Sequence, residues 1–262
     1  ADGLDLSILA PAFITGLVVL MTHVPLGREV VKRGIIFIDL AIAQVAGLGV
    51  IAADTMGWEA RGWMVQFAAV SAALVAAGIL HWTDRRWPQI QEAIIGVAFV
   101  LAATAGILIL AGNPHGGEHL KELLVGQVLW VNVDQLLPVS VISVLVIAAW
   151  FWQRERLKGL GFYALFAFAV TASVQLVGIY LVFASLIIPA LATRNIEPRW
   201  LRVICGYSVG VVGCLAGLVL SIGADLPAGA IVVWSLALTA LVFAWLVWPL
   251  LRGRSQGGQV GD

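Results

Sequence analysis

Long, nearly uninterrupted runs of apolar residues recur from one end of the chain to the other. Each is about as long as the roughly 20 residues that an α-helix needs to cross the hydrocarbon core of a bilayer. The alternation of apolar and polar residues typical of transmembrane β-barrels is absent. The pattern therefore predicts an all-α, polytopic transmembrane helical bundle with spans near 8–24, 35–54, 63–81, 93–112, 136–152, 161–177, 180–193, 203–222 and 230–250.

The number of spans depends on how residues 162–193 fold. Their sequence suits one long helix, two short helices broken at Gly178, or a re-entrant element, so we expect eight or nine spans. The longest connection, about 113–135, is itself mostly apolar, and no soluble domain is predicted. We therefore expect residues 1–262 to form a single transmembrane domain.

The composition supports this and excludes several functions. Hydrophobic residues make up 61% of the chain and charged residues 11%, against about a quarter charged in soluble domains. The 15 basic and 15 acidic residues cancel, so no basic excess indicates a nucleic-acid partner. No lysine follows a glycine, so the phosphate-binding loop Gly-x-x-x-x-Gly-Lys-[Ser/Thr] is absent. We expect a chain that is not an enzyme and binds no cofactor.

The charges are distributed unevenly between the connections. Counting nine spans, the odd-numbered connections and the tail carry thirteen basic residues, and the even-numbered connections carry only Arg61 and Lys121. Because cytoplasmic loops are enriched in Lys and Arg, this places the N-terminus outside and the C-terminus in the cytoplasm. The outer side then has a formal charge of −6, which favours a cationic substrate; its acidic residues are Asp2, Asp5, Asp54, Glu59, Glu118, Glu122, Asp134 and Asp225.

Candidate metal ligands are concentrated in residues 113–122, on the predicted outer face. Asn113 and Pro114 suit the start of a helix. Two imidazoles and two carboxylates would then share one helical face and could bind a zinc-like ion: His115, Glu118, His119 and Glu122. The alternative is a polar loop that simply lies in water.

Two polar residues lie inside the second predicted span. An ionisable group such as Asp39 is costly there and is a functional candidate, although Arg33 is near enough along the helix to be its structural partner. Gln44 lies about 140° around the helix from Asp39, so the two do not form one ligand face. Alone, Gln44 would more often be a residue that hydrogen-bonds another helix.

A short charged loop follows the fifth span. A charge run between spans is usually explained by cytoplasmic topology alone. The functional alternative is a docking surface for a soluble partner, formed by Arg154, Glu155, Arg156 and Lys158.

Glycines recur at four-residue spacing in the span near 203–222. Gly206-x-x-x-Gly210 and Gly213-x-x-x-Gly217 permit close packing of this helix against its neighbours. Such spacing carries no information about a substrate.

Five segments appear in a characteristic order. They are V-V-K-R-G at 30–34, A-I-I-G-V-A-F at 93–99, L-L-V-G-Q-V-L at 123–129, V-G-I-Y-L-V-F-A-S-L-I-I-P-A at 177–190 and D-L-P-A-G-A at 225–230. On these segments the chain resembles, over roughly residues 8–250, the permease subunits of ATP-binding-cassette importers for zinc, manganese and iron.

The resemblance implies a homodimeric or pseudo-dimeric pore in the bacterial inner membrane, in contact with lipid. A separate cytoplasmic ATPase subunit would dock on each half, and an extracytoplasmic metal-binding protein would deliver the ion. Docking would use the charged loop after the fifth span, or the loop that carries Arg194 and Arg199.

The sequence departs from the family in two places. Family members commonly carry D-x-x-x-H in the second span, whereas here Gln44 stands where the His is expected, Leu40 where the Asp is expected, and Asp39 is displaced by one. The coupling segment F-D-P-E-x-A-x-x-L-G that usually follows the fifth span is also missing. The chain resembles a divergent branch of the family.

We therefore expect the permease subunit of an ATP-driven importer of Zn2+ first, then Mn2+ or Fe2+, with His115, Glu118 and His119 as an entry site. One alternative is an importer of a metal chelate or another small solute, because the usual ligand pair is lost. A second is a secondary transporter that works without ATP.

Overall fold

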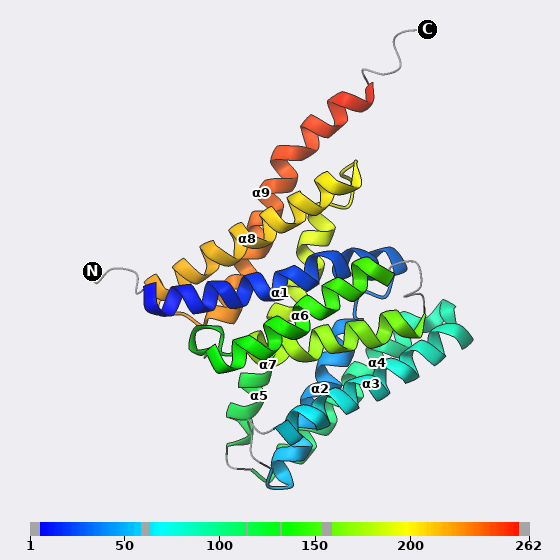
Figure 1. Ribbon diagram of the computed structural model, residues 1–262, viewed down its shortest axis with the longest axis vertical. Helices are drawn as coiled ribbons and strands as arrows, with labels where there is room; N and C mark the ends of the chain where they lie inside the picture. The colour runs from blue at the N-terminus through cyan, green and yellow to red at the C-terminus, as the bar shows by residue number, and fades with distance from the viewer. Residues whose placement is uncertain (1–5, 59–62, 114, 132, 154–158, 257–262) are drawn as a thin grey trace.

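The computed structural model describes residues 6–58, 63–113, 115–131, 133–153 and 159–256, and all regular structure within them is helical (Figure 1). The α-helices of this part of the chain are α1 (Leu6–Arg33), α2 (Ile38–Thr55), α3 (Trp63–Arg86), α4 (Gln91–Leu110), α5 (Gly116–Val125), α6 (Val133–Gln153), α7 (Leu160–Ala192), α8 (Arg199–Ala224) and α9 (Ala228–Gln256). Two short 3-10 turns also occur: η1 (Pro88–Ile90) lies between α3 and α4, and η2 (Val128–Trp130) lies between α5 and α6. The predicted all-α fold is confirmed.

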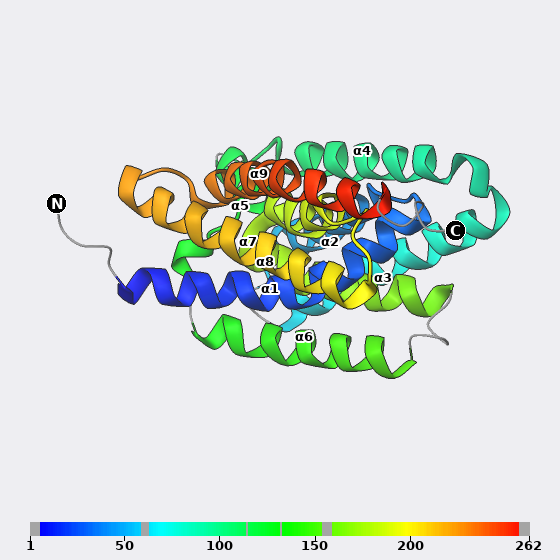
Figure 2. The same ribbon diagram turned by 90° about the horizontal axis from the view of Figure 1, so that it is seen from above.

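Eight of these helices are long and apolar enough to cross a membrane. The exception is α5, whose 10 residues reach only about 15 Å. Several helices are longer than the predicted spans. Helix α1, for example, continues to Arg33, so its basic last turn lies beyond the apolar run predicted at 8–24. Helix α1 begins and α9 ends at opposite sides of the bundle (Figures 1 and 2).

Helix α7 is not one straight rod, because Gly178 interrupts it with φ 79° and ψ 164°. In the first limb, residues 160–177, the Phe162 ring lies 4.0 Å from Cζ of Arg33. In the second limb, residues 179–192, Phe183 stacks on Phe37 at 6.1 Å between ring centroids. Figures 1 and 2 show that α7 begins and ends toward the same side of the bundle, with the break at Gly178 between the two limbs. The chain therefore folds back at Gly178, and the two-helix alternative holds.

The folded-back helix α7 is the centre of the bundle. Both limbs are buried along most of their length. The helices around them, by contrast, expose large apolar side chains such as Trp82 of α3, Trp152 of α6 and Trp234 of α9. Outward apolar side chains are expected where hydrocarbon, and not water, surrounds a helix bundle.

The glycine spacing of α8 has the predicted consequence. A Cβ at Gly206 or Gly210 would crowd the side chains of Val24 and Leu20 in α1, and one at Gly213 or Gly217 would meet the backbone of α9. The absence of side chains at these positions lets α8 lie close to both neighbours.

A proline inside α1 is compensated from α8. Pro25 lacks the N–H that would bond the carbonyl of Met21, four residues earlier. The Tyr207 hydroxyl donates to this freed oxygen at 2.9 Å. No pattern in the sequence indicates this contact.

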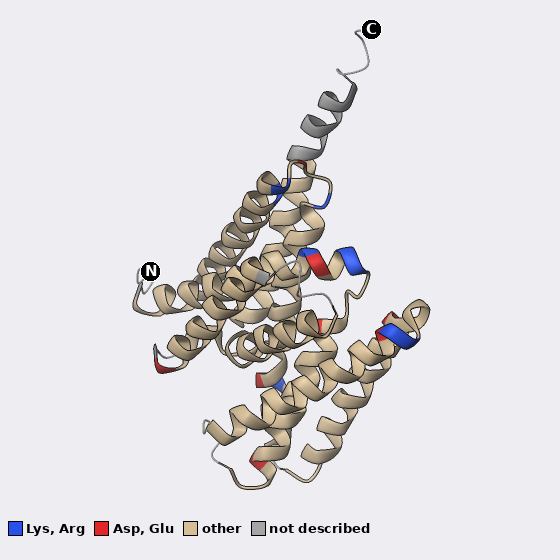
Figure 3. Cartoon of the chain, turned by 45° about the vertical axis from the view of Figure 1, so that its right-hand side comes forward, with Lys and Arg blue, Asp and Glu red and all other residues tan. Residues whose placement is uncertain are grey.

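Basic residues lie mostly toward one end of the bundle, whereas acidic residues occur at both ends (Figure 3). Lys and Arg lie at the ends of α1 and α3 and around the connection from α7 to α8, whereas Asp54 ends α2 and Asp134 begins α6 at the other end. The arrangement agrees with the alternation of charge along the sequence.

Candidate functional site

Two polar side chains of α2 are buried inside the bundle, Asp39 at 0% and Gln44 at 2% exposure. Neither Asp39 oxygen has a hydrogen-bond partner, nor does Oε1 of Gln44, among the described residues; backbone N–H groups at the start of α2 lie near the carboxylate without good geometry. An unpartnered buried polar group costs about 1–3 kcal/mol. Both side chains are therefore candidates for contact with a passing ligand.

The structure decides against Arg33 as the partner of Asp39. The Arg33 guanidinium donates instead to the Glu29 carboxylate, 2.9 Å away in the same helix. Arg33 is therefore not the partner of Asp39, and metal contact by Asp39 stays a prediction.

Glu92, in the first turn of α4, adds a second carboxylate near the start of α2. Its Oε1 accepts from the backbone N–H of Phe37 at 3.2 Å, its Oε2 is buried without a partner, and its charge acts on Asp39. The sequence marks Glu92 only as a charge at the start of a span. Its proximity to α2 depends on how α4 packs.

Through Leu123, helix α5 contacts the face of α2 that carries Gln44. Gln44 and Gly47 are three residues apart and so share a face, and a side chain at Gly47 would overlap Leu123 of α5. The end of α5 is equally tight, because the backbone of Gly126 meets that of Gly178 in α7. A side chain of this short helix therefore packs on the same face of α2 as Gln44, at Gly47.

The predicted outer ligand set is only partly assembled. Helix α5 begins at Gly116, and His115 is its N-cap, whose carbonyl accepts from the His119 N–H at 3.2 Å. The ring of His115 lies 3.6 Å from Glu118, with the side chains 74% and 81% exposed, while Glu122 accepts from Gln127 at 2.6 Å. In the described part of the chain no three His, Cys, Asp or Glu residues lie close enough to hold a metal ion. Metal contact by His115, Glu118, His119 and Glu122 stays a prediction.

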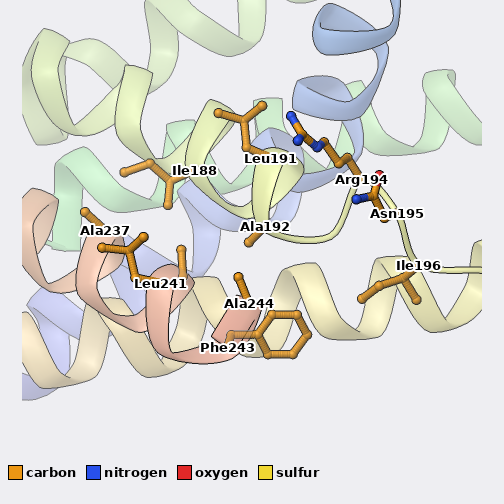
Figure 4. Close-up of a pocket in the computed structure, with 11 residues that line it drawn as sticks. Ile188, Leu191, Ala192, Arg194, Asn195, Ile196, Ala237, Leu241, Phe243 and Ala244 are labelled. Carbon is orange, nitrogen blue, oxygen red and sulfur yellow. The ribbon is translucent and has the colours of Figure 1, made fainter. Parts of the chain in front are cut away.

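The predicted docking residues are only partly visible. Arg154, Glu155, Arg156 and Lys158 lie outside the described residues. Arg194 and Asn195, just after α7, border an apolar groove of about 430 Å³ between the end of α7 and α9 (Figure 4). Arg199 begins α8. Docking by any of these residues stays a prediction.

One buried residue was missed altogether. His23 of α1 is fully buried, and its Nε2 has no partner among the described residues. Its position inside the first predicted span was a sufficient signal, because an ionisable residue there is a functional candidate by default.

A multi-pass helical bundle with buried, unpartnered polar groups between its helices has the architecture of a membrane transport protein. Residues 5–163 and 156–247 match the ABC 3 transport family, and the chain belongs to it. The resemblance found in the sequence is thereby confirmed.

Curated relatives carry names from the same group. The high-affinity zinc uptake system membrane protein ZnuB of Haemophilus influenzae is 25% identical over 251 residues, 86% of this chain and 92% of that protein. The manganese transport system membrane protein MntC of Halalkalibacterium halodurans is 25% identical over 239 residues, 83% of this chain and 80% of that protein.

A solved structure shares the fold. PsaBC from Streptococcus pneumoniae, in complex with Fab, superposes with a TM-score of 0.72 at 20% identity and covers 91% of both chains. This likeness extends over nearly the whole bundle.

Proposed function

We propose that this chain is the membrane-spanning permease subunit of an ATP-driven importer of divalent transition metal ions, with zinc the first candidate and manganese or iron next. The family match over nearly the whole chain carries this proposal. The names of relatives, which include zinc, manganese and chelated iron transport systems, support the substrate class.

The residues suggest a route for the ion. An acidic outer side attracts cations, and α5 with His115, Glu118, His119 and Glu122 offers first contacts there. Movement of α5 would withdraw Leu123 from Gly47, on the face of α2 that carries Gln44. The carboxylates of Asp39 and Glu92 lie further along, near the start of α2.

The same proposal includes three protein partners. A cytoplasmic ATPase subunit docks near Arg154–Lys158 or Arg194 and Arg199, an extracytoplasmic binding protein delivers the ion, and a second copy of this chain completes the pore. The chain lies in the bacterial inner membrane.

The fold-back of α7 supports an outer N-terminus and a cytoplasmic C-terminus. If each limb of α7 is a separate passage, the eight candidate helices give an odd number of passages, which leaves the chain ends on opposite sides. The basic ends of α1 and α3 then lie on the cytoplasmic side.

Uptake by reconstituted complexes tests the proposal. The chain is assembled with its ATPase subunit and binding protein in proteoliposomes, and radioactive zinc uptake is measured with and without ATP. We expect ATP-dependent uptake, reduced about tenfold or more in Asp39→Asn and in Gln44→Ala, because a passing cation loses a carboxylate charge in the first variant and an amide oxygen in the second.

A matched control comes from a buried threonine whose hydroxyl is fully used. The Thr193 hydroxyl donates to the carbonyl of Pro189 at 2.8 Å, and Thr193→Val should leave zinc uptake unchanged. Uptake that follows a proton gradient without ATP would contradict the proposal and favour a secondary transporter.

One observation favours a second candidate, an importer of a metal chelate. No three metal-ligating side chains of the types His, Cys, Asp and Glu come together in the described residues, and a chelate brings its own ligands. Competition separates the two: excess free zinc should block zinc uptake by a bare-ion importer and leave uptake of a preformed chelate intact.

A further inference from the structure

His23 is held in one tautomer by its own helix. Nδ1 lies 2.7 Å from the carbonyl oxygen of Val19 and 3.1 Å from Oγ1 of Thr22. Because a carbonyl can only accept, the short contact requires the proton to be on Nδ1. Nε2 therefore carries a lone pair.

That lone pair has no protein partner among the described residues, although His23 is fully buried. Other buried polar side chains of α1 are satisfied: the Thr15 hydroxyl, for example, donates to the Pro11 carbonyl at 2.9 Å. A buried acceptor left open costs about 1–3 kcal/mol. This imidazole is therefore anchored at one nitrogen and open at the other.

The arrangement suits one class of ligand. Histidines that bind metal ions usually donate their second ring N–H to a backbone carbonyl or carboxylate, which fixes the ring and raises the basicity of the ligating nitrogen. Neutral imidazole nitrogen suits zinc and similar transition metals, whereas alkali and alkaline-earth ions prefer oxygen.

His23 also lies beside the element that contacts α2. It shares a face of α1 with Gly27, four residues on, and Gly27 is packed against the Leu186 carbonyl in the second limb of α7. The same limb contacts the start of α2 through Phe183 and Phe37. The second limb of α7 therefore contacts both α1, four residues beyond His23, and the start of the helix that carries Asp39 and Gln44.

We propose that His23 is a further metal-contacting residue of the transport path, whose Nε2 binds the divalent transition metal ion when the second limb of α7 moves away from α1. The inference rests on the proposed function. It adds to that function a nitrogen ligand on α1, outside the second span.

The decisive variant is His23→Asn. The Asn amide can keep an N–H near the position of Nδ1 and leaves nothing at the position of Nε2. In the reconstituted complex with its ATPase subunit and binding protein, we expect normal assembly. We expect the apparent KM for zinc to rise about tenfold or more.

The preference between metals distinguishes a ligand from a structural residue. Imidazole favours zinc over manganese, so loss of Nε2 should lower the ratio of zinc to manganese uptake. A purely structural defect would slow both ions alike. The control is Thr15→Val, which removes a satisfied polar group from the same buried helix and should preserve both the KM and the ratio.

The inference would be overturned if His23→Asn took up zinc with the wild-type KM and the wild-type ratio of zinc to manganese uptake. The proposed function would still stand in that case. Wild-type complexes that take up no transition metal with ATP would instead remove the proposed function, and this inference with it. If the Asn variant fails to assemble, His23→Gln is the second variant, because it places an amide near the position of Nε2. An unchanged zinc-to-manganese ratio in that variant would also overturn the inference.

Discussion

A side chain of one helix can donate the hydrogen bond that a proline removes from a neighbouring helix. The phenol of Tyr207 donates to the Met21 carbonyl that Pro25 leaves open. This bond joins α8 to α1 where Pro25 interrupts the hydrogen bonding within α1. Its contribution to the free energy of unfolding should depend on Pro25, so it can be measured in chains with and without that proline.

We expect Tyr207→Phe to lower the free energy of unfolding in detergent by about 1–2 kcal/mol, because it leaves the Met21 carbonyl unpaired inside the bundle. Thermal or denaturant unfolding of the purified chain measures this.

The background Pro25→Ala provides the control. Alanine restores the N–H that bonds Met21 within α1, so Tyr207→Phe should cost clearly less there. Equal costs in both backgrounds would show that Tyr207 stabilises the chain in some other way.

The candidate site was only partly predictable at this scale. Asp39 and Gln44 stand out because polar residues are rare inside a span, and both are buried. The sequence could not decide between Arg33 and a ligand as the partner of Asp39, since that depends on which carboxylate Arg33 bonds. The proximity of Glu92 to α2 requires helix packing that no local pattern encodes.

Among the elements, α7 shows how one glycine redirects a long apolar run. Gly178 adopts φ 79°, a conformation that residues with a Cβ rarely adopt. It also meets the backbone of Gly126, at the end of α5. The fold-back of α7 and the packing of α5 against it therefore depend on the same contact, between Gly178 and Gly126.

We expect Gly178→Ala to destabilise the chain by more than about 3 kcal/mol, because backbone strain adds to overlap with the Gly126 backbone. Yield of folded protein and thermal unfolding in detergent provide the measurement. Gly96→Ala is the control, since Gly96 is helical in α4 with open space where its Cβ would lie, and it should be neutral or slightly stabilising. Equal effects of the two substitutions would contradict the importance of the contact.

On the scale of the whole molecule, charge separation predicts how the bundle sits in the membrane. The outer end of α2 and the basic end of α3 should lie on opposite sides. Thr55 and Arg85 are exposed at these two ends.

Cysteine labelling tests this orientation. In a chain with Cys205 and Cys214 replaced by serine, an impermeant maleimide added to intact cells should label Thr55→Cys at once. It should label Arg85→Cys only after the inner membrane is opened. The reverse pattern would invert the proposed topology and place the acidic loops in the cytoplasm.

By itself, the sequence determined the helical class, most of the spans and the alternation of charge. These follow from the length of apolar runs and the cost of moving charge through lipid, both of which are local properties. Only the tertiary structure decided that α7 folds back at Gly178, that Glu92 lies near Asp39, and that Nε2 of His23 is left open. Each of these depends on which helix faces pack together. The residues in contact are far apart in the sequence, so the local pattern around one of them does not indicate the other.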